Sequence, residues 1–238
     1  TPHQSSAASD VYKRQTPDAG NVNFEGTAIE FGNTNNAIKL GIGMVHQHFT
    51  LAENLTVLEN IIIGRQSIFS LSLPKRQART KILELSKKFG LPIDPDELVA
   101  NLSVSEKQRI EILKTLFLDC KLLILDEPTA ALTPQETDAL FSTIRNMIKT
   151  GLSVILISHK LNEILAVSDR IIVLRNGSSV GETDTKSADR EQIAEMIVGK
   201  KIDYPQKIKT PRKLKVLSLL DVSYTKTDAP NLSAVNLN

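Results

Sequence analysis

A continuous apolar run, Leu122 to Leu125, restricts the folds open to this chain because it ends in two adjacent carboxylates, Asp126 and Glu127. An unbroken run of aliphatic residues is typical of a strand that is buried on both faces of a parallel sheet. Sheets of this kind bind ligands at the carboxyl ends of their strands. The run therefore predicts a buried strand that brings two acidic side chains to a ligand-binding edge. Capping of a turn or a helix is the alternative role for this pair.

The segments on both sides of the run predict two helices and a second strand. Ser103 and Glu106 have the spacing of a helix capping box, and so do Thr133 and Glu136. Residues 154–157 form another short aliphatic run, which predicts a second buried strand. The order strand, helix, strand with short connections is typical of a parallel crossover. We therefore predict an α/β fold with a parallel-sheet core.

Other segments predict the elements around this core. Alternating apolar residues from 22 to 31 predict a short antiparallel hairpin, and residues 42–46 predict a strand. A helix is predicted from Pro74 and Lys75 to Gly90, within a helical insertion. Residues 170–183 contain an Asn-Gly turn and predict a further hairpin.

The composition excludes several classes of protein. With 41% hydrophobic and 24% charged residues in 238, the chain is an ordinary globular sequence rather than a disordered or collagen-like one. The net charge of +2 gives no indication of a nucleic-acid partner.

Cys120 is the single cysteine, so the sequence has no internal disulfide. His46 and His48 have no evident third ligand, which disfavours a metal site there. No apolar run approaches the roughly 18 residues of a spanning helix.

Four segments together resemble the motifs of ABC-type ATPases. LLILDEPTAAL is similar to their Walker B segment, and LSVSEKQR, residues 102–109, is similar to their signature motif. Gln47 in GMVHQHF resembles their Q-loop glutamine, and His159 in VILISHK resembles their switch histidine. The motifs follow the family's order and spacing, and the resemblance covers about residues 16–200. It implies a P-loop NTPase-type ABC ATPase domain with a parallel-sheet core, a helical subdomain and antiparallel β elements.

The resemblance implies a role for each matched residue. Asp126 would bind Mg²⁺ through water, Glu127 would act on the attacking water, and Gln47 would touch both the metal and the water. His159 would contact the γ-phosphate of ATP. Phosphoryl transfer depends on such positioning and charge stabilisation more than on covalent chemistry.

The signature residues Ser103, Val104, Ser105 and Glu106 would bind the nucleotide of the opposing domain, with Ser103 capping a helix whose amino-terminus points at the γ-phosphate. Val104 and Ser105 replace the two glycines usual in the family, and Glu106 replaces its glutamine. Valine in the first place and glutamate in the last are typical of the sugar and nucleoside importer branch. Ser105 occupies a position where a side chain can crowd the phosphate. Thr133 replaces the aspartate usual after the Walker B segment.

The sequence contains no phosphate-binding loop of the P-loop type. No Gly is followed at the required spacing by Gly-Lys-Ser/Thr, and the pair Gly199-Lys200 is followed by Lys201. In the family this loop lies upstream of the position of Thr16. We therefore expect an ABC domain that is truncated at its amino-terminus, whose complete form uses ATP and Mg²⁺.

Four parts are expected along the chain. Residues 1–15 are expected to be foreign or disordered, and residues 16–200 to be a first ABC ATPase domain without its Walker A part. Residues 201–215 are rich in Lys and Arg and contain two prolines, which is typical of a solvated linker. Residues 216–238 resemble the start of a second ABC domain.

The resemblance also implies a function. HQHFTLAENLTVLENIIIG and residues 195–199 are similar to the ATPases of simple-sugar and purine-nucleoside uptake systems, and the HQHF form favours nucleosides. The implied protein is an ATP-hydrolysing subunit, peripheral on the cytoplasmic face of the cell membrane. Its implied partners are transmembrane permease subunits, a second ABC domain of the same chain or of a partner copy and, indirectly, an extracytoplasmic solute-binding protein. No nucleic acid is expected as a partner.

Two other functions stay open. A soluble ABC protein of translation or DNA repair would be expected to carry long coiled-coil insertions or a basic nucleic-acid face, and the sequence has neither. A non-catalytic fragment is the other alternative, because a polypeptide without a P-loop lacks most of its nucleotide affinity.

Overall fold

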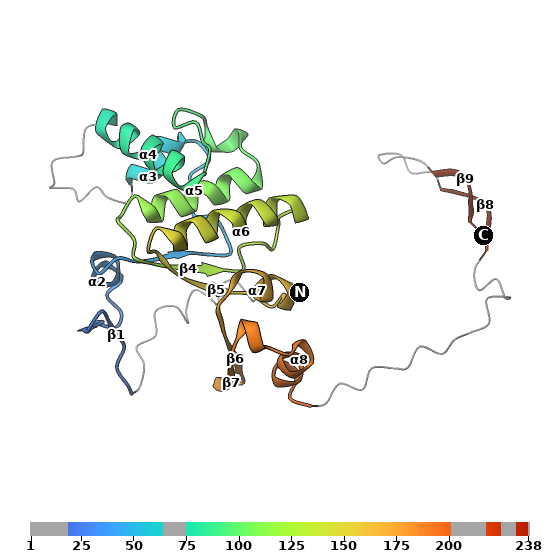
Figure 1. Ribbon diagram of the computed structural model, residues 1–238. Helices are drawn as coiled ribbons and strands as arrows, with labels where there is room; N and C mark the ends of the chain where they lie inside the picture. Colours follow the sequence, from blue (N-terminus) through green and yellow to red (C-terminus); the bar gives the residue numbers. More distant parts are fainter. Residues whose placement is uncertain (1–18, 64–74, 201–217, 225–231, 238) are drawn as a thin grey trace. The chain divides into compact units, whose positions relative to one another are not determined.

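The computed structural model describes residues 19–63, 75–200, 218–224 and 232–237. The chain divides into two compact units, of which the first ends at Ile197 and the second begins at Val198. The first unit holds a central sheet and the helices that pack on it (Figure 1). Residues 1–15, which we expect to be foreign or disordered, lie outside the described part.

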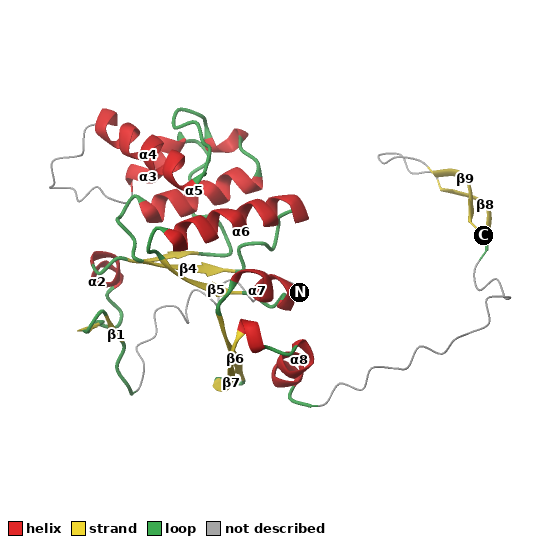
Figure 2. Cartoon of the chain, in the orientation of Figure 1, coloured by secondary structure: helices red, strands yellow, loops and turns green. Residues whose placement is uncertain are grey.

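Three strands form this sheet, in the order β3, β4, β5 (Figure 2). Their bounds are Ile42–Val45 for β3, Leu122–Asp126 for β4 and Ser153–Ile157 for β5. Both pairings are parallel, and Leu125 of β4 pairs with Val45 on one side and Leu156 on the other. All three strands therefore end at the same edge. The predicted parallel α/β core is confirmed.

Helices α5 (Val104–Leu116) and α6 (Pro134–Lys149) pack on the sheet, α5 against β3 and α6 against β5. Gly43 of β3 permits the close approach of α5, because a Cβ at this position would lie 1.9 Å from Cγ2 of Thr115. The main core lies between these layers and includes Val45, Ile110, Leu113, Leu123, Leu125, Phe141, Ile144 and Met147. Removal of these apolar side chains from water is the main force that holds the layers together.

The prediction that β5 is a buried strand is wrong for part of its residues, whereas every residue of β4 is at least partly buried. Leu123 and Leu125 are fully buried, whereas Ile155 and Ile157 of β5 are 48% and 45% exposed. Side chains alternate along a strand, so these isoleucines point to the face opposite Leu123 and Leu125. An aliphatic run therefore identified the strand without showing whether a second layer covers it.

The two predicted capping boxes are confirmed. The side chain of Ser103 caps the first turn of α5 and Glu106 returns a bond to its backbone, and Thr133 and Glu136 do the same for α6. Gly151 follows the end of α6 with a φ of 94°, a left-handed conformation that glycine adopts without strain.

The predicted helical insertion is confirmed for the described residues. It contains α3 (Val57–Ile63) and α4 (Lys75–Phe89), both of which contact α5, and the short 3-10 turn η1 (Val99–Asn101) follows it. An antiparallel bridge joins Thr56 to Leu98 at the base of the segment. The buried side-chain amide of Asn60 provides hydrogen-bond partners for backbone groups of the loop before α3. It donates to the Ala52 and Thr56 carbonyls and accepts from the Ala52 N–H.

Smaller elements flank the core of the first unit. β1 (Asn23–Phe24) and β2 (Thr27–Ala28) form the first predicted hairpin and are followed by α2 (Thr34–Lys39). β5 leads to α7 (Leu161–Val167), then β6 (Arg170–Arg175), β7 (Ser178–Asp184), η2 (Thr185–Ser187) and α8 (Arg190–Val198). β6 and β7 pair antiparallel as predicted, and Asn176 and Gly177 both have the positive φ of a type I′ turn.

The second unit contains β8 (Leu219–Tyr224) and β9 (Leu232–Leu237), which pair antiparallel. A strand is thus present in the segment where we expect a second ABC domain to start. The expected linker, residues 201–215, lies outside the described residues. Among the described helices, none combines the length and the apolar character that crossing a bilayer requires.

Candidate active site at the carboxyl edge of the sheet

The parallel sheet brings Gln47, Glu127 and His159 to one edge. Gln47 lies two positions beyond the end of β3, Glu127 directly follows β4, and His159 lies two positions beyond the end of β5. Because the three strands are parallel neighbours, residues far apart in the sequence meet here. The side chain of Glu127 is the common partner of the other two.

Two contacts define this group. Nδ1 of His159 lies 3.0 Å from Oε1 of Glu127, and Nε2 of Gln47 lies 3.4 Å from Oε2 of the same carboxylate. A carboxylate oxygen accepts hydrogen bonds, so Gln47 and His159 are the donors. The His159 side chain is 69% exposed and that of Glu127 is 30% exposed. The carboxylate is therefore held from two sides while the group stays open to solvent and to a substrate.

The backbone of Glu127 is unusual. Its φ is 47°, in the left-handed region that few residues other than glycine occupy. The turn is fixed on both sides, because Glu127 N–H donates to the Ile157 carbonyl at 2.9 Å and Ala130 N–H donates to the Glu127 carbonyl at 3.2 Å. Strained backbone of this kind clusters at functional sites and persists only where its surroundings hold it.

Asp126 is the last residue of β4 and is partly buried. It pairs with Ile157 of β5 in the sheet register, so its side chain belongs to the same edge as Glu127. The described residues contain no group of three or more His, Cys, Asp or Glu side chains that could hold a metal ion. Oxygen donors in small number suit Mg²⁺, which is commonly bound by one or two protein groups together with water and substrate phosphates.

The signature segment begins the helix α5. Ser103 Oγ donates to Oε2 of Glu106 at 2.7 Å, and the same carboxylate oxygen accepts from the Ser103 N–H at 2.9 Å. These bonds lower the pKa of Glu106 below its ordinary value. Among the described residues, no hydrogen bond joins Ser103 or Glu106 to Gln47, Glu127 or His159.

The two residues that replace the usual signature glycines have different surroundings. Val104 is 42% exposed, so the first turn of α5 presents an apolar side chain to solvent. Ser105 is partly buried, and its hydroxyl lies 3.2 Å from that of Ser103. Ser105 also lowers the pKa of Glu136, after the larger effect of the Thr133 backbone bond. The serine hydroxyl thus faces the start of α6.

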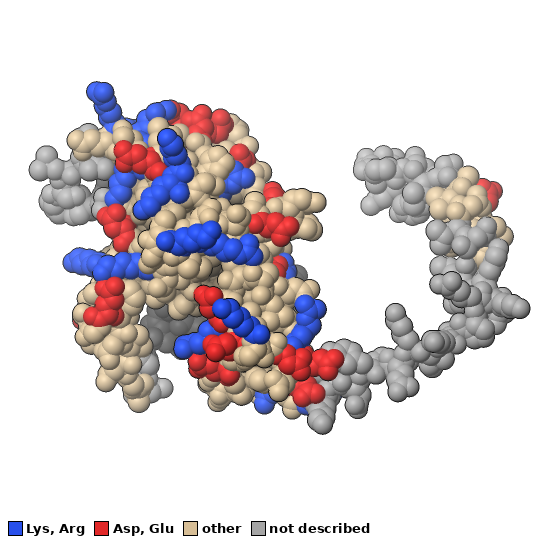
Figure 3. Space-filling view, in the orientation of Figure 1, with Lys and Arg blue, Asp and Glu red and all other residues tan. Residues whose placement is uncertain are grey.

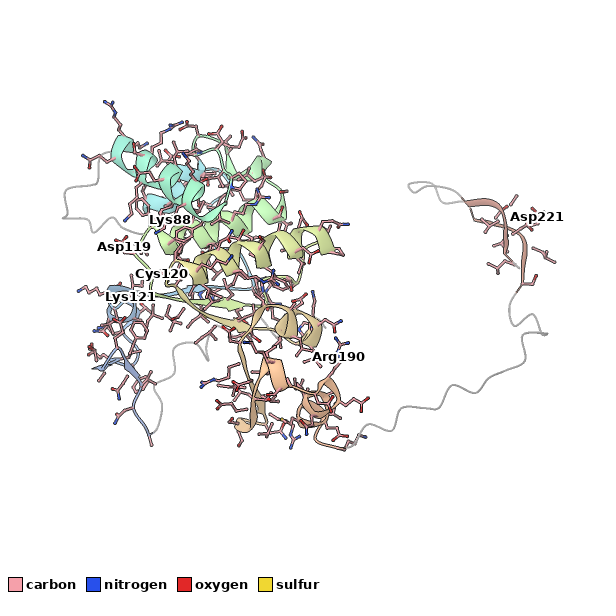
Figure 4. The ribbon with its side chains drawn as sticks, viewed as in Figure 1. Lys88, Asp119, Cys120, Lys121, Arg190 and Asp221 are labelled. Atoms are coloured by element: carbon pink, nitrogen blue, oxygen red, sulfur yellow. The ribbon has the colours of Figure 1, made fainter. Side chains whose placement is uncertain are left out.

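The opposite end of β4 offers no comparable chemistry. Asp119, Cys120 and Lys121 connect α5 to β4 there (Figure 4). Cys120 is partly buried, and this burial raises the pKa of its thiol. Reactive cysteines need an accessible thiolate, and so Cys120 is a packing residue.

Acidic and basic side chains are mixed on the face of the molecule shown in Figure 3. Several form ion pairs across the helical part, such as Arg79 with Asp96 at 2.7 Å and Lys107 with Glu53 at 2.8 Å. The hydrogen bond between Arg79 and Asp96 raises the pKa of Arg79 and lowers the pKa of Asp96.

The family model described as ABC transporter matches residues 5–130, which include Gln47, the signature segment and the β4 edge. The chain belongs to the ABC transporter family. The matched range includes part of residues 1–15, whose origin stays a prediction.

Curated relatives of this ABC chain are importer subunits. The nucleoside import ATP-binding protein NupA of Lactococcus lactis is 45% identical over 188 residues, which cover 79% of this chain and 37% of that protein. The glucose import ATP-binding protein TsgD13 of Haloferax volcanii is 40% identical over 222 residues, which cover 81% of this chain and 40% of that protein. The ABC chain thus spans about two fifths of the length of these relatives.

Solved ABC structures share the fold. The ADP conformation of MJ1267, an ATP-binding cassette of an ABC transporter, superposes with a TM-score of 0.67 at 21% identity and covers 81% of this chain and 83% of that one. At this identity the likeness concerns the fold alone. It supports the arrangement of parallel sheet, helical part and antiparallel elements in this ABC chain.

The tertiary structure of the ABC chain also identifies polar residues that the motifs do not point to. Gln108 is buried in α5 and donates to the Pro128 carbonyl, so the signature helix is tied to the turn after Glu127. Glu111, 7% exposed, accepts from both N–H and Oγ1 of Thr50, three residues beyond Gln47. Thr129, which is buried, donates to the partly buried Glu163 carboxylate. The only feature of the sequence that could have identified Gln108 and Glu111 is their position on the apolar face of a predicted helix. Nothing in the sequence indicates that Thr129 contacts Glu163.

Proposed function

We propose that the protein containing this chain is the ATP-hydrolysing subunit of an ABC importer for nucleosides or simple sugars. One observation carries the proposal: the Glu127 carboxylate is held between Gln47 and His159 at the ligand-binding edge of a parallel sheet. The names of the relatives, which are nucleoside and glucose import proteins, support the class of solute.

In this proposal Glu127 acts on the attacking water. Its carboxylate orients the water toward the γ-phosphate of ATP and accepts a proton from it. Gln47 and His159 hold this carboxylate in place, since each donates to a different oxygen of it. When ATP is bound, the exposed His159 ring is free to turn one nitrogen to the γ-phosphate.

We assign Mg²⁺ binding to Asp126, through water, and to the side-chain oxygen of Gln47. The few oxygen donors at this edge fit an ion that arrives with the nucleotide rather than one that resides in a protein cage. The ion supplies charge neutralisation for the phosphates. The two neighbouring carboxylates have different roles in this proposal. Asp126 is the last residue of strand β4, whereas Glu127 lies in the turn that follows the strand.

Residues 103–106 serve the opposing nucleotide in this proposal. Ser103 caps α5 by accepting from the Glu106 N–H, and the remaining N–H groups of the first turn would form the anion-binding end. Val104, Ser105 and Glu106 complete the surface that would meet the phosphate. The opposing nucleotide is held by a second ABC domain, either in the same polypeptide, for which residues 216–238 are the candidate start, or in a partner copy.

A phosphate-binding loop is needed for this function and does not occur in the 238 residues. We propose that it lies upstream of Thr16 in the parent protein. The sequence of the upstream coding DNA tests this point directly: a Gly-rich loop ending in Gly-Lys-Ser/Thr is expected there. A long upstream reading frame without such a loop would contradict it.

The further partners follow from the proposed class. Transmembrane permease subunits bind the helical part, residues 51–98, at the cytoplasmic face of the membrane, and a solute-binding protein acts from the other side. The solute is selected by those partners. Residues 64–74 of the helical part lie outside the described structure.

The experiment is reconstitution of the parent protein with its permease in liposomes. ATP hydrolysis is expected to rise when a binding protein loaded with nucleoside or sugar is added, and labelled solute is expected to accumulate. ATP hydrolysis that no solute stimulates, in a protein that binds no permease, would favour the soluble ABC alternative instead.

A further inference from the structure

Glu163 is a largely buried carboxylate that the proposed mechanism does not use. It lies in the first turn of α7, and its side chain is 11% exposed. A carboxylate withdrawn from water is costly unless hydrogen bonds or charges compensate it. The partners of Glu163 are therefore informative about what it holds.

Its partners come from two different loops. One carboxylate oxygen, Oε2, accepts from Thr129 Oγ1 and, at 3.4 Å, from Ser158 Oγ. The other oxygen, Oε1, pairs with Lys160 Nζ at 3.0 Å. Thr129 itself is 2% exposed, so this contact is shielded from water.

Lys160 closes the cluster. The side-chain ammonium of Lys160 donates to the Thr129 carbonyl at 3.1 Å and to Thr129 Oγ1 at 3.3 Å. The backbone N–H of Lys160 donates to Ser158 Oγ at 3.0 Å. Thr129, Ser158, Lys160 and Glu163 are thus joined by several bonds each. We call these four residues the loop clamp.

The loop clamp lies next to the candidate catalytic residues in the chain. Thr129 is two residues after Glu127, and Ser158 and Lys160 are the two neighbours of His159. The candidate catalytic residues themselves join the two loops through the 3.0 Å pair of His159 and Glu127, and both partners of that pair are accessible to solvent. An exposed pair of this kind adds little to the free energy that holds two loops together, so the more buried contacts of the loop clamp carry more of it.

We infer that Glu163 is a positioning residue, which through Thr129 and Lys160 holds the loop of Glu127 and the loop of His159 at a fixed separation. This inference rests on the proposed function, because it assigns Glu163 to the hydrolytic step. Glu163 does not touch the reacting atoms. Misplacement of catalytic groups by about 1 Å can slow a reaction about 100-fold, so loss of the clamp acts on kcat.

The test uses the full-length parent protein, with ATP hydrolysis measured over a range of ATP concentrations. Glu163→Gln keeps the shape of the side chain but removes the charge that pairs with Lys160, and kcat is expected to fall about 10-fold or more, with KM for ATP changed less than about 2-fold. Thr129→Val, which removes one hydroxyl, is expected to have the same effect, and Thr129→Ser is expected to restore kcat. Glu182→Gln is the matched control, since it removes a carboxylate that pairs with Arg170 at 3.2 Å in the β6–β7 hairpin.

The outcomes separate the inference from the function on which it rests. An unmodified parent protein that does not hydrolyse ATP would overturn both. An active parent in which Glu163→Gln and Thr129→Val turn over like Glu182→Gln would overturn the inference alone. So would a change in KM or in the thermal midpoint without a change in kcat, because that result shows a structural role only. If Glu163→Gln fails to fold, the Thr129→Val and Thr129→Ser pair decides.

Discussion

His159 Nδ1 and Glu127 Oε1 lie 3.0 Å apart, although the residues are separated by 32 positions in the chain. The contact exists because β4 and β5 are parallel neighbours that end at the same edge. The carboxyl ends of these strands place Glu127 and His159 side by side. No local feature of the sequence indicates that these two residues are in contact. The predictions below concern this edge and the elements that support it.

The first prediction is that Glu127→Gln in the parent protein abolishes ATP turnover and leaves ATP binding intact. The amide keeps the shape of the side chain but cannot accept the proton of the attacking water, an effect worth about 100-fold or more. Hydrolysis and nucleotide binding are measured with the catalytic residue of any second domain disabled. Hydrolysis at the wild-type rate would show that Glu127 is not the base.

Asp126→Asn is expected to behave differently from Glu127→Gln. It removes a charge from the proposed Mg²⁺ shell, so the affinity for Mg-ATP falls along with turnover. Titration of Mg²⁺ at fixed ATP separates the variants: only Asp126→Asn is expected to need more metal. Equal Mg²⁺ dependence in both variants would contradict the assignment of Asp126.

The 238-residue polypeptide by itself is expected to bind ATP weakly or not at all. It contains no glycine-rich loop and no P-loop lysine to cradle the phosphates. Titration with labelled ATP and Mg²⁺ measures this affinity. A submicromolar dissociation constant would count against the prediction.

The helical part, residues 51–98, is expected to contact the permease. Thr56 and Glu59 belong to this part of the chain. The side chain of each accepts a hydrogen bond from the backbone N–H of the other at the start of α3, so a cysteine at either position would disturb the helix. Asn54 is exposed in the preceding turn and is the better site. Asn54→Cys is expected to crosslink to the permease of an assembled transporter, and a cysteine at exposed Gln192 in α8 serves as the negative control. Equal crosslinking at both sites would contradict this surface.

The capping box of α5 is expected to weaken in acid. The pKa of Glu106 is lowered in the folded state from its ordinary 4.5, so the ionised carboxylate stabilises the fold above that pH, and the contribution is lost as the pH falls through the lowered pKa. Unfolding midpoints of the chain and of Glu106→Gln are expected to differ at about pH 6 and to converge as the pH falls below 4.5 and through the lowered pKa. A constant difference across this range would show that the charge is not involved. Ser103→Ala is expected to cost about 1 kcal/mol at about pH 6 and less in acid, because its hydroxyl also donates to the ionised Glu106 carboxylate.

The local elements were predictable because short-range chemistry decides them. Ser103 with Glu106 and Thr133 with Glu136 form capping boxes whose partners lie within one helical turn. The Asn176-Gly177 turn requires positive φ at both positions, which Asn and Gly tolerate. Aliphatic runs likewise identified β4 and β5 as strands, and their separation by a helix indicated a parallel pairing.

Burial and long-range polar contacts were decided by tertiary structure. The composition of β5 could not show how much of the strand the helices cover. In the described part of the chain Ile155 and Ile157 are exposed, where the aliphatic run predicts burial. The sequence named Gln47, Glu127 and His159 as separate motif residues by resemblance, but the two hydrogen bonds on Glu127 depend on the register of the strands.

The loop clamp shows the same division most clearly. The sequence by itself determined where β4 and β5 end, and hence which loops carry Glu127 and His159. Only the tertiary structure brought Thr129 and Glu163, 34 positions apart, into contact. The physical reason is that a hydrogen bond is specified by distance and direction within a few tenths of an ångström. Residue type and spacing fix such geometry within one turn of helix, whereas between distant segments the packing of the whole sheet fixes it.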